Sequence, residues 1–108
     1  MKVQLRTDNL MTRAWLAPVV EAAGARLLRP SDPPEADLLV VDLTSLGAVE
    51  AIARNRTSRS GLFILAFGPH TDREILRAAR EAGADEVVAR GAVAARIEKR
   101  LQVLGEPR

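Results

Sequence analysis

The sequence contains no cysteine among its 108 residues, which excludes disulfide bonds, thiolate metal sites and cysteine nucleophiles. Aromatic residues are also scarce, because Trp15, Phe63 and Phe67 are the only ones. Proteins that bind single-stranded nucleic acids usually stack the bases on several aromatic side chains. The charge balance offers no basic tract either, since 16 Lys and Arg residues accompany 14 Asp and Glu residues, for a net charge of +2. We therefore expect no binding to nucleic acid.

Long hydrophobic runs are absent as well. No apolar stretch approaches the roughly 20 residues of a membrane-spanning helix, and the segment Met1–Arg6 turns polar too early for a signal peptide. We therefore expect a soluble, cytoplasmic protein that does not bind membranes. Hydrophobic residues make up 47% of the chain, which is enough for one core at this length. We expect one domain over residues 1–104 and a short tail over residues 105–108.

Apolar segments typical of strands alternate along the chain with segments of helical periodicity. We expect strands at residues 2–6, 25–28, 36–42, 62–67 and 86–89, and helices at residues 10–23, 48–54, 72–81 and 92–104. Pro18 lies inside the first helix and predicts a kink or a later start. The polar segment 55–60 is expected to break the chain between a helix and a strand. Five strands with helical connections predict an α/β fold with a doubly wound parallel sheet.

Asp42 is the most informative residue, because it ends the apolar run 36–42 with a carboxylate. Four consecutive aliphatic residues before it indicate a strand that is covered on both faces. In open α/β sheets, ligands bind beyond the carboxyl ends of such strands. Asp42 is therefore predicted to stand in a functional crevice. The alternative is that its side chain only caps the following turn or helix.

Three segments resemble the receiver domains of bacterial two-component response regulators. They are residues 2–9 followed by a helix, residues 37–43, and residues 79–90, in which Gly83 ends a helix just before the last strand. The resemblance covers nearly the whole chain and implies a flavodoxin-like fold with the strand order 2-1-3-4-5. In that order, Asp8 and Asp42 lie at one crevice, where the strand order reverses.

The resemblance also implies site residues, and several of them depart from the family pattern. Asp42 matches the aspartate that receivers phosphorylate. The two adjacent acids that hold magnesium in receivers correspond to Thr7 and Asp8, which weakens the metal site, although Asp8 and Asp42 could still hold a hydrated Mg²⁺ ion. The hydroxyl residue that ends the fourth strand corresponds to Gly68, which has no side chain. The lysine after the fifth strand corresponds to Arg90, whose planar fork suits a carboxylate partner.

These departures predict a degenerate, stand-alone receiver that acts as a signalling or protein-interaction module without phosphorylation. In this interpretation Arg90 pairs with Asp42 and holds the crevice in one state; alternatively, Arg90 is a solvated loop residue. A first alternative function is a phosphoacceptor receiver that uses Asp42 and Mg²⁺. A second is a small enzyme or anion-binding protein that uses Asp42, His70 and Arg90. The plainer interpretation of His70 is an exposed residue before a helix cap. We expect no enzyme activity and no resident cofactor.

The connector at residues 29–35 contains three prolines and is too short for the helix that receivers usually carry there. The second helix is therefore predicted to be reduced or missing, which leaves an exposed apolar surface near Leu27, Pro30, Pro33 and Pro34. We expect a homodimer or another protein partner to use that surface, or the face formed by the helix at 72–81, the last strand and the last helix. Alternatively, the prolines alone cover the gap.

Overall fold

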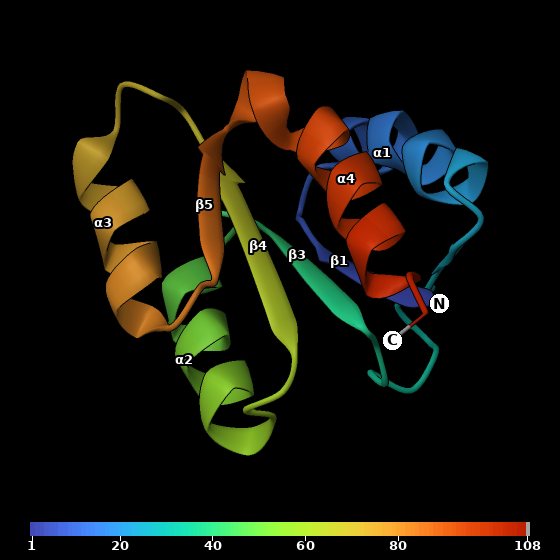
Figure 1. Cartoon of the computed structure of the whole chain (residues 1–108). Coiled ribbons are helices and arrows are strands. Elements are labelled where there is room, and N and C mark those ends of the chain that lie inside the picture. The colour runs from blue at the N-terminus through green and yellow to red at the C-terminus, as the bar shows by residue number, and fades with distance from the viewer. Residues whose placement is uncertain (108) are drawn as a thin grey trace.

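The computed structural model describes residues 1–107, which form a five-stranded parallel sheet in the order β2-β1-β3-β4-β5 (Figure 1). This order confirms the predicted flavodoxin-like receiver topology. None of the helices in this part of the chain is long and apolar enough to cross a membrane. The elements are β1 (Lys2–Arg6), α1 (Leu10–Ala22), β2 (Arg26–Leu27), β3 (Leu38–Asp42), α2 (Ala48–Ser58), β4 (Phe63–Gly68), α3 (Arg73–Ala82), β5 (Glu86–Ala89), the short 3-10 helix η1 (Arg90–Ala92) and α4 (Val93–Leu104).

Two hydrophobic clusters lie on opposite faces of the sheet. Helices α1 and α4 lie together on one face and α2 and α3 on the other, as Figure 1 shows. Every residue of β3 is buried, because this strand is central and both of its faces are covered. Consecutive side chains of β3 and β4 therefore alternate between the two clusters. This packing fixes the carboxyl end of β3, and with it Asp42, at one edge of the sheet.

Pro18 led to two alternative predictions for the first helix, a kink or a late start, and the helix does not start late. Helix α1 starts at Leu10 because the side chain of Asn9 accepts hydrogen bonds from the amides of Met11 and Thr12, at 2.8 and 3.3 Å. Pro18 lies inside the helix, so the expected delayed start is wrong. A proline has no N–H to give to the preceding turn, and tertiary packing of the helix outweighs that loss.

The predicted polar break at residues 55–60 is wrong for residues 55–58, because α2 continues to Ser58, and the break between α2 and β4 begins only at Arg59. Polar side chains in this last stretch bond to the backbone of the same helix. Asn55 donates to the carbonyl of Ala51 at 2.8 Å, and Thr57 donates to that of Ala53 at 3.0 Å. Polarity was therefore a poor sign of a loop here, since an exposed helix face is polar as well.

The connector between β2 and β3 contains no helix, so the second receiver helix is missing, as predicted. Side chains fix the connector in place. Asp32 accepts a hydrogen bond from the amide of Arg29 at 2.7 Å and pairs with the guanidinium groups of Arg26 and Arg29. The hydrogen bond from the Arg29 amide lowers the pKa of the Asp32 carboxyl below its usual range. Arg59, just beyond α2, donates to the carbonyls of Pro34 and Ala36.

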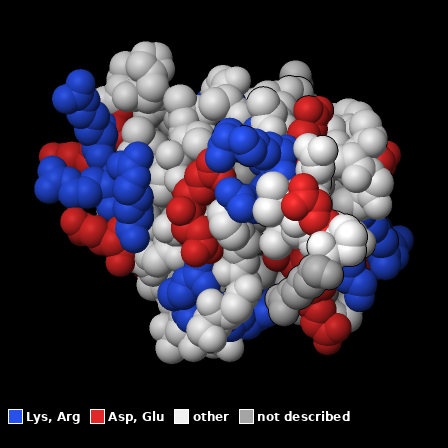
Figure 2. All heavy atoms as spheres, viewed as in Figure 1, with Lys and Arg blue, Asp and Glu red and all other residues white. Residues whose placement is uncertain are grey.

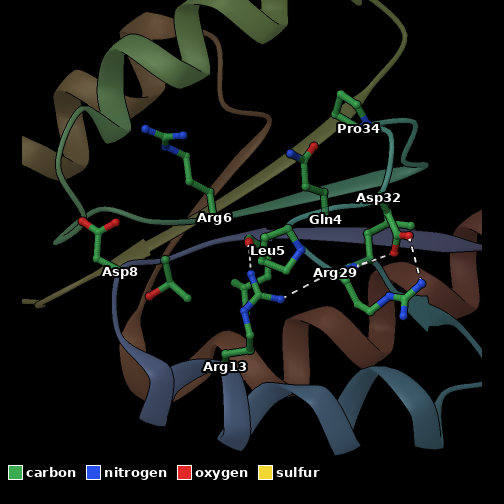
Figure 3. A pocket seen from close by; sticks show the side chains of 11 residues that line it. Gln4, Leu5, Arg6, Asp8, Arg13, Arg29, Asp32 and Pro34 are labelled. Atoms are coloured by element: carbon green, nitrogen blue, oxygen red, sulfur yellow. Dashed lines mark hydrogen bonds and ion pairs between the residues drawn. The ribbon is translucent and has the colours of Figure 1, made fainter.

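On β1 the sheet face beside the missing helix is polar, whereas Pro30, Pro33 and Pro34 of the connector are exposed, as predicted. Gln4 and Arg6 point from β1 away from α1 (Figure 3) and lie next to Leu39 and Val41 of β3 in the parallel register. The intervening β1 side chains, Val3 and Leu5, belong to the cluster under α1 and α4. The uncovered part of the sheet therefore needs no apolar partner, because β1 alternates between a core face and a polar face.

Candidate functional site

Asp42 lies at the carboxyl end of β3 with only 1% of its surface exposed. Three hydrogen bonds satisfy its carboxylate. The Thr7 hydroxyl donates to Oδ2 at 2.7 Å, and Thr44 donates to Oδ1 through its hydroxyl at 2.7 Å and its amide at 3.0 Å. The Ser45 hydroxyl donates to the Asp42 carbonyl. Both carboxylate oxygens are therefore engaged by groups of the protein itself.

Asp8 belongs to the same region but faces a different partner. Its Oδ2 accepts a hydrogen bond from the Leu46 amide at 2.8 Å, which ties the β1–α1 loop to the β3–α2 loop. Asp8, Asp42 and Thr44 all line one hollow of about 470 Å³. The structure thus brings Asp8 and Asp42 to a common crevice, as the predicted strand order requires.

The donor set of this crevice does not fit a magnesium ion as it stands. Mg²⁺ requires near-octahedral oxygen coordination and binds through carboxylates that are free to face it. Here two threonine hydroxyls direct their protons at the oxygens of Asp42, and Asp8 directs Oδ2 at an amide. Among residues 1–107, no three or more His, Cys, Asp or Glu side chains gather as a metal site would require.

Gly68 ends β4 and is buried against Leu43. A Cβ atom at this position would lie 3.3 Å from the Cβ and 3.4 Å from the Cδ1 of Leu43, and 3.6 Å from the Cδ2 of Leu76. Such distances are tight for a carbon atom, and a hydroxyl side chain would extend further. A serine or threonine at this position would therefore require Leu43 to shift by a few tenths of an ångström.

Arg90 does not pair with Asp42, so that prediction is wrong. Its Nη2 donates to the hydroxyl of Thr12 at 2.8 Å, and its guanidinium lies 5.1 Å from the ring centroid of Trp15 and 5.8 Å from that of Phe67. These contacts also correct the alternative of a solvated arginine without contacts. The physical reason is that hydroxyl and amide donors already satisfy Asp42, while an aromatic face attracts the guanidinium.

His70 lies exposed in the loop between β4 and α3. The hollow beside Asp42 is lined by neither His70 nor Arg90, so the structure does not bring the three residues of the enzyme hypothesis to one pocket there. The predicted alternative that the Asp42 side chain caps the following turn is met by the bond from the Thr44 amide, whereas the Thr44 hydroxyl was not predicted as a second donor. The signal was present in the sequence, since a threonine two residues after an aspartate commonly closes a local turn with it.

No protein-family model matches this chain, and no curated protein sequence matches it. Solved structures do. An orphan response regulator of H. pylori is similar with a TM-score of 0.76 at 23% identity, over 94% of this chain and 96% of that chain. A CheY-like receiver domain protein from Methanospirillum hungatei gives 0.77 at 13% identity, over 94% of each chain. A response regulator from Thermotoga maritima gives 0.75 at 15% identity, over 95% of each chain. Over nearly its whole length, this chain has the fold of response-regulator receiver domains.

Proposed function

We propose that this protein is a receiver-like signalling module that acts through protein contacts and without phosphorylation of Asp42. The observation that carries the proposal is the hydrogen bonding of Asp42, both of whose carboxylate oxygens are engaged by Thr7 and Thr44. To accept a phosphoryl group, one of these oxygens must attack phosphorus as a nucleophile. The charge-assisted hydrogen bonds draw electron density from these oxygens and lower their nucleophilicity.

Three further features of the crevice support the same conclusion. Thr7 replaces one acid of the receiver pair, so less negative charge is available to attract a divalent cation. Gly68 has no side chain where receivers carry a hydroxyl, and Leu43 lies close to the position that a Cβ atom would take there. Arg90, at the position of the receiver lysine, is held by Thr12 and Trp15 instead of facing Asp42. Each part of the phosphoryl site is thus replaced by an internal contact.

The proposed setting is the cytoplasm, and the proposed partner is a protein, either a second copy of this chain or another component. One face suited to such contacts is formed by α3, β5 and α4. Figure 2 shows basic and acidic side chains interspersed on the visible side of the molecule rather than one tract of a single sign. On β5, Glu86 pairs with Arg96 and Arg100 of α4. This mixture of charges fits a protein partner better than a nucleic acid.

Phosphodonor labelling tests the proposal. Wild-type protein incubated with acetyl phosphate and Mg²⁺ is expected to show no added phosphoryl group in its intact mass, because both carboxylate oxygens of Asp42 already accept hydrogen bonds from Thr7 and Thr44. The matched control is Asp42→Asn, which should give the same mass profile relative to its own untreated sample. Substantial labelling of the wild type that disappears in Asp42→Asn would establish the phosphoacceptor alternative instead.

A further inference from the structure

Exposed apolar side chains gather at the rim of the Asp42 crevice. Leu46 is 88% exposed, Leu10 83%, Met11 79% and Trp15 38%. They are four of the six large hydrophobic residues that are exposed in the part of the chain that the structure describes. We call these four residues the rim patch. Isolated exposed apolar residues need no explanation, but a cluster beside a crevice indicates an interaction surface.

The rim patch is built from one helix, α1, and one loop, between β3 and α2. Leu10 and Met11 line the same hollow as Asp42, and Trp15 lies one turn beyond Met11 on α1. Leu46 is fixed at both backbone groups, because its amide donates to Asp8 and its carbonyl accepts from Arg6 at 3.2 Å. The patch is therefore built on anchored backbone, which reduces the entropy lost on binding.

An acidic and a basic side chain, Asp8 and Arg90, flank the rim patch, and each has hydrogen-bonding atoms without a partner in the described part of the chain. Asp8 lies beside Leu46 and uses Oδ2 for the Leu46 amide, while its Oδ1 has no hydrogen-bond partner among residues 1–107. Arg90 lies over Trp15 and gives one Nη2 hydrogen bond to Thr12. A guanidinium carries five N–H donors, so Arg90 retains several for an outside partner. The rim patch thus has an acceptor at one end and donors at the other.

We propose that the rim patch docks a second copy of this chain in a two-fold symmetric dimer. A two-fold interface brings each end of a patch against the opposite end of its copy. Asp8 of one protomer would then meet Arg90 of the other, twice, with Leu10, Met11 and Trp15 buried between the two pairs. A partner of a single charge would complement only one end. The dimer would also cover the crevice that contains Asp42, and in this respect the inference rests on the proposed function.

Sedimentation and light scattering across a concentration series test this interface. Wild type is expected to dimerise, and Met11→Lys or Leu10→Lys should weaken dimerisation at least about tenfold, because each places a charge at the apolar centre. Ala53→Lys is the matched control, since Ala53 is exposed on α2, outside the rim patch and outside the face formed by α3, β5 and α4, and it should dimerise like wild type. Both lysine variants replace exposed side chains, so circular dichroism should show an unchanged fold.

A charge exchange gives the sharper test. Asp8→Arg alone and Arg90→Asp alone should each weaken the dimer, and the double variant should recover part of the loss, because it restores the opposite charges but not the hydrogen bond that the Leu46 amide donates to Asp8. A wild type that stays monomeric at its highest soluble concentration would overturn the dimer, as would unchanged dimerisation in both lysine variants or a double variant no better than the singles. Phosphodonor labelling of Met11→Lys separates the proposed function from the proposed dimer. Labelled Asp42 would contradict a receiver that acts without phosphorylation, while the dimerisation measurements would still stand.

Discussion

Asp42 shows how a buried carboxylate can be stable without a cation beside it. An unpaired charge in a protein interior costs several kcal/mol, and the usual remedies are an ion pair or a metal. Here two hydroxyls and one amide supply the compensation. Hydrogen bonds to a charged acceptor contribute about 1.5–3 kcal/mol each. Thr7 therefore has a structural role in this chain at the position where receivers carry an acid.

Thr7→Val should lower the free energy of unfolding by about 1–3 kcal/mol, because it removes the donor to Asp42 Oδ2 while nearly preserving side-chain volume. Chemical denaturation measures this change. Thr7→Ser retains a hydroxyl and is the control, which should stay within about 0.5 kcal/mol of wild type. Equal loss of stability in the two variants would show that the hydroxyl is not the stabilising group.

At the scale of elements, one arginine of α2 connects this helix to the segments that lead into β4 and β5. Arg56, near the end of α2, donates to the carbonyls of Gly83 at 2.9 Å and Leu62 at 2.8 Å, and it pairs with Asp85. Asp85 also accepts from the amide of Ile64 at 2.8 Å, in β4. Gly83 has a φ of +119°, and a Cβ there would lie 2.7 Å from the Cγ of Arg56. The glycine before the last strand therefore has both a conformational and a steric cause.

Arg56→Ala should lower the free energy of unfolding by about 2–4 kcal/mol. It leaves the carbonyls of Gly83 and Leu62 without their side-chain donor and removes the ion-pair partner of Asp85. Thermal and chemical unfolding check the value. Arg54→Ala is the matched control on the same helix, since Arg54 is exposed and its side chain makes no hydrogen bond or ion pair among the described residues. A loss in Arg56→Ala no larger than that in Arg54→Ala would contradict the anchoring role.

At the scale of the whole molecule, the fold tolerates the loss of one helix because the sheet is not equally apolar on its two faces. β1 reads Lys-Val-Gln-Leu-Arg, so Val3 and Leu5 face the core under α1 and α4 while Gln4 and Arg6 face the gap. The side chains that line this gap enclose a polar hollow of about 340 Å³ between β1 and the connector (Figure 3). The missing helix thus leaves a polar groove and no uncovered core.

The sequence predicted the fold well because its strongest signals are local. The aliphatic run before Asp42 indicates a strand covered on both faces, and Gly83 marks a helix end. The predicted pair of Asp42 and Arg90 was wrong, because it required knowing which of several donors reaches a carboxylate from 35 or 48 residues away along the chain. The predicted apolar surface is confined to the exposed prolines of the connector and does not extend over β1. The alternation within β1 already showed that one of its faces is polar.

The most direct test of whether Asp42 can accept a phosphoryl group is residue-resolved amide NMR in the presence of Mg²⁺ and beryllofluoride, which together with the carboxylate mimics an aspartyl phosphate. Unlike labelling, it does not depend on how long a phosphoryl group survives hydrolysis. The hydrogen bonds from Thr7 and Thr44 predict that the amides of Asp8, Asp42, Thr44 and Gly68 show no saturable shift beyond that seen in Asp42→Asn. Saturable shifts at these four amides in wild type, absent from Asp42→Asn, would contradict a receiver whose phosphoryl site is closed.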